Sequence, residues 1–210
     1  MCTPIKIVCE GGTGEVVEKK SRFIANVFPV HSEEEALEYI TQIRKKHYDA
    51  RHNCFAYVIG EKNETERCSD DGEPSGTAGR PMMDVITGQG LHDVLVVVTR
   101  YFGGTLLGTG GLVRAYSAAV KAGLENCTIQ EKRKGHLMIL KTDYNGLGKI
   151  QYIAANMEIE EKDSVYGEGV ELTYIVPVEK VEAFEREITE KTGGRTEIDR
   201  GEETWIYWNI

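Results

Sequence analysis

The sequence predicts an α+β protein built from two domains. Its 210 residues are 40% apolar, which is enough to bury one large core or two small ones, and the length favours two. Short β-branched or apolar runs alternate with segments of helical spacing along the chain. After residue 127 this alternation becomes regular, so we expect a first domain at residues 1–127 and a second at residues 128–210.

The first clear pattern in the first domain is a strand followed by a helix. Residues 21–28 are rich in apolar and β-branched side chains and lead into Pro29, which predicts a strand. Ser32 then predicts a helix start, because its side chain can cap free N–H groups and Glu35 completes a capping box. The face expected to be buried recurs at helical spacing at Ala36, Ile40, Ile43 and His47.

The middle of the first domain contains a second strand and a long irregular segment. Residues 53–59 predict the strand, and residues 60–67 predict a polar hairpin or loop. The next segment, residues 68–81, has too many glycines and prolines for regular structure. Within it, Pro81 suits the first turn of a short helix that ends near Gly88.

A buried strand, a glycine-rich connection and a helix complete the first domain. Residues 94–99 are an unbroken apolar run, which predicts a strand covered on both faces. The connection at residues 103–111 leads into a helix at residues 112–124, and such a turn presents backbone N–H groups to an anion. It is not a Walker loop, because no lysine follows Gly108. Alternatively, its glycines supply positive φ and close helix packing.

The second domain is predicted to be ferredoxin-like. Its expected elements are a strand at 135–142, a helix at 146–157, strands at 158–165 and 170–176, a helix at 179–192 and a strand at 195–208. The order of these elements is βαββαβ, which is the ferredoxin-like arrangement.

Charge and composition exclude several classes of protein. The net charge of −9 opposes non-specific binding to nucleic acid, because such binding depends on neutralising phosphates. The first domain has a net charge of −3 and the second of −6, so the first is the better candidate for meeting a polyanion. No apolar run approaches the roughly 20 residues that cross a bilayer, and the first residues lack a signal peptide's apolar segment. We therefore expect a cytoplasmic protein. The cysteines at positions 2, 9, 54, 68 and 127 lack zinc-site spacing, so we expect reduced thiols.

Cationic and aromatic residues flank the glycine-rich connection. Arg100 and Arg114 bracket it, with Tyr101 and Phe102 beside the first of them. Such a set can hold a phosphate and stack a base. The alternatives are that Phe102 belongs to the core and that the arginines are only solvated.

Two other groups of residues are candidates for chemistry. Asp70, Asp71 and Glu73 can bind a hard cation such as magnesium, pair with the two arginines, or form a turn. His52 and Cys54 lie two apart on an expected strand and face the same way, which places either a base beside a thiol or a buried cysteine next to a satisfied histidine.

Two long motifs resemble the signature of the YigZ/IMPACT family. The first is Asp-Asp-Gly-Glu-Pro-Ser-Gly-Thr-Ala-Gly at residues 70–79. The second is Val-Thr-Arg-Tyr-Phe-Gly-Gly-Thr-Leu-Leu-Gly-Thr-Gly-Gly-Leu-Val-Arg-Ala-Tyr at residues 98–116. Shorter matches at residues 20–24 and 50–57 extend the resemblance over residues 15–125, and the second domain matches that of the bacterial members.

The resemblance implies a fold and a role. It implies that the first domain has the βαβ-rich fold of a small-subunit ribosomal protein and of elongation factor G domain IV, and that the second is similar to elongation factor G domain V. That pairing implies contact with the ribosome, RNA or a translation factor. The resemblance places the candidate surface on Asp70, Asp71, Glu73, Thr77, Arg100, Tyr101, Gly103, Gly104, Gly108, Gly110, Gly111 and Arg114.

The expected function is that of a non-enzymatic, translation-associated binding or regulatory protein, with no cofactor, metal or catalytic residue. Two alternatives stay open. One is a metal-assisted hydrolase or phosphoryl-transfer enzyme that holds a cation on the acidic residues 70–73. The other is a protein-interaction module whose acidic second domain docks a basic partner.

Overall fold

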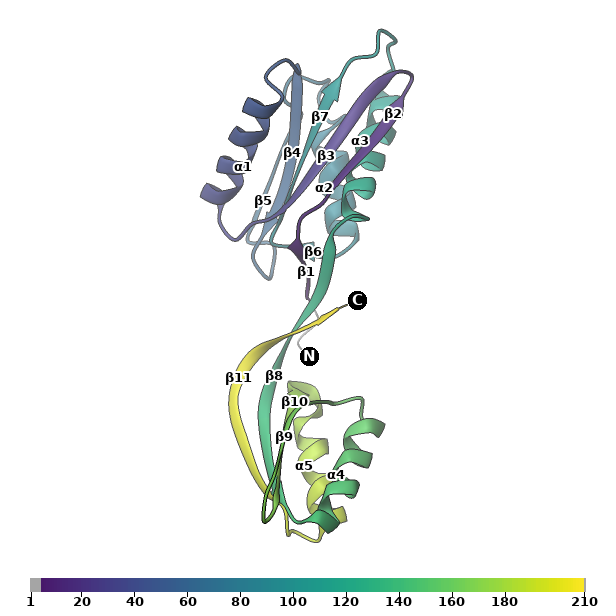
Figure 1. Cartoon of the computed structure of the whole chain (residues 1–210). Helices are drawn as coiled ribbons and strands as arrows, with labels where there is room; N and C mark the ends of the chain where they lie inside the picture. Colours follow the sequence, from purple (N-terminus) through teal and green to yellow (C-terminus); the bar gives the residue numbers. More distant parts are fainter. Residues whose placement is uncertain (1–4, 210) are drawn as a thin grey trace. The chain divides into compact units, whose positions relative to one another are not determined.

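The computed structural model describes residues 5–209, and the side chains of residues 5–207. The chain divides into two compact units, Ile5–Glu131 and Lys132–Trp208 (Figure 1). Both units mix strands and helices, which confirms the predicted α+β class. Within residues 5–209, no helix has the length and apolar character needed to cross a membrane.

The first unit contains a sheet of five strands in which each neighbouring pair is antiparallel. Its strands are β2 (Thr13–Glu18), β3 (Ser21–Pro29), β4 (His52–Ile59), β5 (Thr65–Ser69) and β7 (Val94–Tyr101). Their order across the sheet is β2-β3-β7-β4-β5. The strand β7 therefore lies between β3 and β4, which do not pair with each other.

Helices cover both faces of this sheet (Figure 1). The helix α1 (Glu33–Lys46) packs against one face, where it meets Leu95 and Val97 of β7. The helices α2 (Gly79–Gly88) and α3 (Thr109–Leu124) pack against the opposite face, where they meet Val96 and Val98. Because successive side chains of a strand point to opposite faces, β7 is buried on both. The prediction of a doubly covered strand at residues 94–99 is confirmed.

The start of α1 agrees with its sequence signal. The Ser32 side chain accepts a hydrogen bond from the Glu35 backbone N–H at 3.2 Å. The Glu35 carboxylate reaches back to the backbone N–H of His31 at 2.8 Å, one residue before the position that a standard capping box uses. Ala36, Ile40 and Ile43 are buried, as their spacing predicted, and His47 is half-buried at the end of the helix.

Several elements of the first unit differ from the prediction. The segments predicted to be loop or irregular, residues 60–67 and 68–81, contain the edge strand β5, which pairs with β4 through its backbone. Its side chains are largely exposed and polar, so they carry no apolar alternation. The helix α2 has Pro81 in its first turn and ends at Gly88, as predicted, whereas α3 begins at Thr109, before the expected 112. The structure adds β2 and two strands that pair in parallel, β1 (Ile5–Glu10) and β6 (Leu91–His92).

The second unit has the predicted ferredoxin-like order βαββαβ. Its elements are β8 (Thr128–Thr142), α4 (Tyr144–Asn156), β9 (Glu160–Tyr166), β10 (Val170–Pro177), α5 (Val181–Thr192) and β11 (Glu197–Asn209), with a 3₁₀ turn at Val178–Lys180 before α5. The strand order β11-β8-β10-β9 is that of the ferredoxin-like sheet. Both helices contribute to one core with β8 and β10. The first four residues of β8 belong to the first unit.

Candidate functional site

A groove of about 900 Å³ opens in the first unit where β7 ends and the glycine-rich connection begins. Three separate parts of the chain line it: residues 49–52, which lead into β4; residues 72–74, from the first long motif; and residues 100–112, from the second. The two motifs and the shorter match at residues 50–57 are distant in sequence but meet around this concavity. Its volume lies in the range of small-ligand sites.

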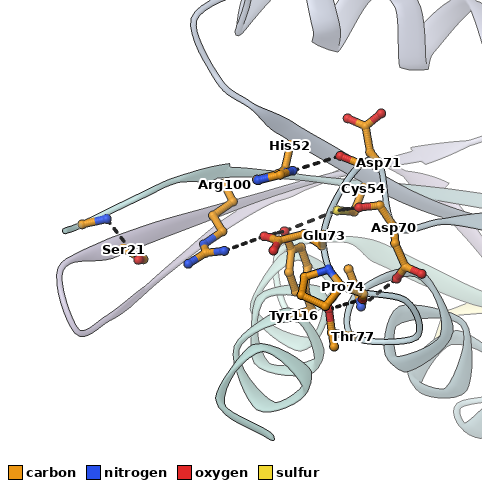
Figure 2. Close-up of polar contacts among 12 residues, drawn as sticks. Ser21, His52, Cys54, Asp70, Asp71, Glu73, Pro74, Thr77, Arg100 and Tyr116 are labelled. Atoms are coloured by element: carbon orange, nitrogen blue, oxygen red, sulfur yellow. Dashed lines mark hydrogen bonds and ion pairs between the residues drawn. The ribbon is translucent and has the colours of Figure 1, made fainter. Parts of the chain in front are cut away.

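The floor of the groove is a buried ion pair. Arg100 donates a hydrogen bond from Nη1 to Oε1 of Glu73 at 2.7 Å, and only 7% and 3% of these side chains are exposed (Figure 2). The hydroxyl of Tyr116 donates to the same oxygen at 2.8 Å. Because burial raises the pKa of Tyr116, its hydroxyl keeps its proton and acts as a donor. This pair confirms that an acidic residue of the first motif pairs with a flanking arginine.

One edge of the Arg100 guanidinium has no partner. Its Nε atom is buried without a hydrogen-bond acceptor, and within residues 5–207 Nη2 forms no hydrogen bond. The guanidinium carbon lies 5.4 Å from the ring centre of Phe23 and 5.6 Å from that of Phe102. The group is therefore held in place by two rings and a carboxylate, while the three N–H donors on Nε and Nη2 stay unused.

The start of α3 contributes free backbone donors to the same groove. Gly108 precedes the helix at φ 72° and ψ 167°, a conformation that is almost confined to glycine, and it offers no side-chain cap. The first helical hydrogen bond runs from the N–H of Leu112 to the carbonyl of Gly108 at 3.0 Å. The N–H groups of Thr109, Gly110 and Gly111 therefore have no partner within the helix, and they mark its positive end.

Asp70 has a structural role outside the groove lining. Its carboxylate accepts hydrogen bonds from the backbone N–H groups of Gly76, Ala78 and Gly79 at 2.8, 2.9 and 2.8 Å, which caps the start of α2. Burial alone raises the pKa of Asp70, but these three donors outweigh it and hold the pKa below its ordinary value. Thr77 is also structural, because its hydroxyl donates to the carbonyl of Pro74 at 2.7 Å.

We expect the Asp70 cap to make stability depend on pH. Because its folded pKa is depressed, the stabilisation is complete above the ordinary aspartate pKa of about 3.9 and is lost as the pH falls through the lower folded value. The free-energy gap between wild type and Asp70→Asn, measured by denaturation, should be largest at pH 7 and narrow towards pH 3. Asp84→Asn, on an exposed carboxylate, serves as the control. A gap that stays constant with pH contradicts this role.

Asp71 is engaged separately from the other two carboxylates. It accepts from the backbone N–H of Asn53 and from Nη2 of Arg44, both at 2.7 Å. Each of the three acidic residues thus serves a different set of donors. Residues 5–207 contain no group of three or more His, Cys, Asp or Glu side chains placed to hold a metal ion. The arrangement therefore does not support a shared cation site on Asp70, Asp71 and Glu73.

The glycines of the connection have different surroundings. A Cβ at Gly103 would overlap the backbone of Lys20, and the Gly103 N–H donates to Ser21 Oγ at 3.1 Å. Gly111 is buried, and a Cβ there would lie 3.1 Å from Cβ of Leu107. Gly104 and Gly110 are exposed; a Cβ would meet nothing within 4 Å at Gly104 and only Nη1 of Arg114, at 3.7 Å, at Gly110. Close packing therefore explains Gly103 and Gly111, whereas Gly110 lies free on the first turn of α3.

The aromatic and cationic residues of the second motif divide between the groove and the surface. Tyr101 lines the groove, donates to Asp49 at 2.9 Å and lies 3.0 Å from Nδ1 of His47. Phe102 also lines it and is 56% exposed, so the alternative that it belongs to the core is wrong. Arg114 is exposed on α3 and is not part of the groove lining.

Arg51, just before β4, and His52, its first residue, add groups that the candidate surface expected from the sequence did not include. Arg51 is exposed at the groove and forms no ion pair within residues 5–207. His52 also lines it, and its Nδ1 donates to the carbonyl of Asp71 at 2.9 Å, which leaves Nε2 as the acceptor of the neutral ring. Both residues lie in the short family match at residues 50–57, and this match was the feature of the sequence that could have placed them in the site.

Cys54 is a structural thiol. Its Sγ lies 3.0 Å from the carbonyl of Asp70 and 3.3 Å from the hydroxyl of Tyr116, and it can donate its single proton to either. Burial raises the pKa of Cys54 to about 12, so the thiol stays protonated at neutral pH. The buried-cysteine interpretation of this residue is confirmed. Cys9, Cys68 and Cys127 are also free thiols, and Cys2 lies outside the described residues.

Comparison with known proteins identifies both halves of the chain. Residues 19–124 match the family model of the Impact N-terminal domain, and residues 140–195 match a domain of unknown function, DUF1949. The chain is 44% identical to the IMPACT family member YvyE of Bacillus subtilis over 199 residues, covering 95% of this chain and 92% of that protein. It is 36% identical to the IMPACT family member YigZ of Escherichia coli over 182 residues, covering 86% and 89%.

A solved structure has the same fold. The crystal structure of a hypothetical protein matches with a TM-score of 0.59 and 34% sequence identity, and the match covers 93% of this chain and 96% of that one. The first family match covers both long motifs, and the second covers the middle of the second unit. The chain belongs to the IMPACT family, among the members that carry the second domain.

Proposed function

We propose that the chain is a non-enzymatic, translation-associated protein that binds RNA through the groove surface of its first unit. The observation that carries the proposal is the joint presence, around one concavity, of an unpaired cation, an exposed aromatic ring and an uncapped helix start: Arg51, Phe102 and Thr109. Cations and helix starts contact phosphates, and exposed aromatic rings stack on bases. The association with translation rests on the resemblance to ribosomal-protein and elongation-factor domains.

The electrostatics favour a local contact. With a net charge of −9, the chain has no general attraction for a polyanion, so the affinity depends on the few donors at the groove. Arg51 and the start of α3 supply that charge, because the charge of Arg100 is balanced by Glu73. We therefore expect moderate affinity and a shallow dependence on salt, corresponding to about one or two phosphates.

An enzymatic role has less support. The thiol of Cys54 is protonated and buried, and the carboxylates of Asp70, Asp71 and Glu73 are each used by structural donors. The hydroxyl of Tyr116 is buried and occupied by Glu73. These groups favour a rigid binding surface over a nucleophile or a shared metal.

Binding of a fluorescent 12-nucleotide single-stranded RNA, followed by anisotropy at several salt concentrations, tests the proposal. Phe102→Ala is expected to weaken binding by about 5- to 100-fold through the loss of one stacked base. Arg51→Ala should weaken binding of every sequence and reduce the salt slope by about one. Matched controls are Arg80→Ala, on an exposed arginine of α2, and Tyr152→Ala, on an exposed ring of the second unit.

The controls decide how a loss of binding is interpreted. Equal losses in the groove and control variants, binding that ignores salt, or no binding by the wild type would overturn the RNA assignment. Co-sedimentation of the same variants with ribosomes then tests the link to translation, and we expect the order of affinities seen with RNA to be repeated.

A further inference from the structure

Arg100 is a buried guanidinium with one complete edge unused. Only 7% of its side chain is exposed, and it lines the groove. Of its guanidinium nitrogen atoms, only Nη1 forms a hydrogen bond within residues 5–207, and this bond goes to Glu73. Figure 2 shows the single dashed line from its guanidinium to that carboxylate. Buried donors nearly always have partners in native proteins, so the orphaned Nε is a donor that an acceptor from outside the chain can satisfy.

The unused edge has a defined shape. In a guanidinium, Nε–H and the neighbouring Nη2–H point the same way, so together they match two oxygens of a phosphate or carboxylate. Glu73 fixes the opposite edge, and the rings of Phe23 and Phe102 restrict the plane of the group. Little side-chain freedom is therefore lost when an oxyanion binds.

The start of α3 is an independent source of donors in the same groove. The helix is 16 residues long, it has no side-chain cap at Gly108, and its first three N–H groups lack helical partners. Gly108 and Thr109 line the groove together with Arg100. A helix start with free N–H groups favours an anion, and phosphate is the usual one.

The rest of the groove fits a planar organic group better than an inorganic ion. Phe102 and Leu106 border it with 56% and 82% of their surfaces exposed, and its volume far exceeds that of one phosphate. An exposed ring accepts a stacked base. His52 offers Nε2 as a hydrogen-bond acceptor for an amino or hydroxyl group of such a ligand.

We propose that the groove is a nucleotide pocket, in which the Nε–Nη2 edge of Arg100 and the start of α3 hold the phosphate while the base lies against Phe102. This inference deepens the proposed function and rests on it, because it names one nucleotide as the unit of recognition. The same chemistry is presented by a free mononucleotide and by a nucleotide at the end of or within RNA, so the experiment must separate these sources.

Isothermal titration calorimetry on the full chain tests the pocket with AMP, GMP, CMP and UMP, their nucleosides, inorganic phosphate, and 12-nucleotide RNA with and without a 5′-phosphate. The nucleotides should bind at least 10-fold more tightly than the matching nucleosides. A free-ligand site predicts that a mononucleotide competes with the RNA, whereas preference for the 5′-phosphorylated RNA assigns the site to an RNA end. Nucleosides that bind as tightly as nucleotides would overturn the phosphate contact.

Two substitutions weaken the two proposed phosphate contacts, one at Arg100 and one at the start of α3, without truncating a core side chain. Arg100→Lys keeps a cation beside Glu73 but lacks the two-donor edge. Gly110→Asp places a carboxylate on the first turn of α3, where the nearest atom to a new Cβ is Nη1 of Arg114 at 3.7 Å. A carboxylate there stabilises the helix and repels an anion, so failure to fold is not the expected outcome.

Each substitution should weaken nucleotide binding at least 10-fold. The controls are Arg80→Lys on α2 and Gly148→Asp on α4, where a new side chain meets no neighbour within 4 Å. Wild-type nucleotide affinity in Gly110→Asp would overturn the pocket. Wild-type RNA binding in both groove variants would overturn the pocket and leave the proposed function standing. Binding of mononucleotides by a wild-type chain that does not bind RNA would overturn the proposed function and leave the pocket standing.

Discussion

Replacing Glu73 with alanine is expected to lower the free energy of unfolding by about 3–5 kcal/mol. The substitution leaves the Arg100 guanidinium buried without its counter-charge and removes the acceptor of the Tyr116 hydroxyl. An unpaired buried charge is costly because the protein interior screens it far less than water does. Urea denaturation followed by far-UV circular dichroism measures the change, and hydrogen exchange of β7 peptides assigns it to the first unit.

The matched control for this prediction is an exposed ion pair in the same sheet. Glu15 pairs with Arg22 at 2.9 Å, and 41% and 53% of these side chains are exposed. Because solvent screens such a pair, Glu15→Ala should change the free energy of unfolding by less than about 1 kcal/mol. A Glu73→Ala loss as small as that of the control would show that the buried pair does not organise the groove.

Replacing Gly103 with alanine is expected to destabilise the first unit by about 2–3 kcal/mol. The new Cβ would overlap the carbonyl group of Lys20, which is backbone and cannot rotate away. Relief requires a shift of the connection away from β3, which also breaks the hydrogen bond from the Gly103 N–H to Ser21. The same denaturation assay measures the loss.

Gly110→Ala is the control from the same glycine-rich connection. A Cβ there has space, since its nearest neighbour lies at 3.7 Å, and alanine is the better helix former by about 0.5–1 kcal/mol. We therefore expect Gly110→Ala to stabilise the protein slightly while Gly103→Ala destabilises it. Effects of the same sign at both positions would contradict the separation of packing glycines from free ones.

The parts of the fold that the sequence predicted are those whose burial leaves a pattern. The core strand β7 shows an unbroken apolar run, α1 shows helical spacing, and the second unit alternates regularly. The edge strand β5 was missed for the converse reason. Its exposed side chains include Glu66 and Cys68, and it is held by backbone hydrogen bonds that any sequence can form. The strand β6 has only two residues, too few for a period to be seen, and β1 was not predicted either.

The sequence predicted which segments form the candidate site, but it did not predict which side chains pair with each other there. The two motifs meet at the groove, and Glu73, Arg100, Tyr101 and Gly108 line it. The choice of Asp70 as a helix cap and Glu73 as an ion-pair partner depends on tertiary structure, because Arg100 lies 27 residues from Glu73 and Tyr116 lies 43 residues from it. Composition and spacing cannot distinguish adjacent carboxylates whose surroundings are set by distant segments.

The central position of β7 has a consequence for how the first unit folds. The strands β2 and β3 form one hairpin and β4 and β5 form another, but the two hairpins join only through β7, which pairs Ala25 with Val98 on one side and Cys54 with the same Val98 on the other. During synthesis neither hairpin has a further strand to pair with until residues 94–101 emerge, and an isolated hairpin is at best marginally stable in water. We therefore expect the five strands to join into one sheet only after β7 is present, and long-range pairing of this kind is slow to form.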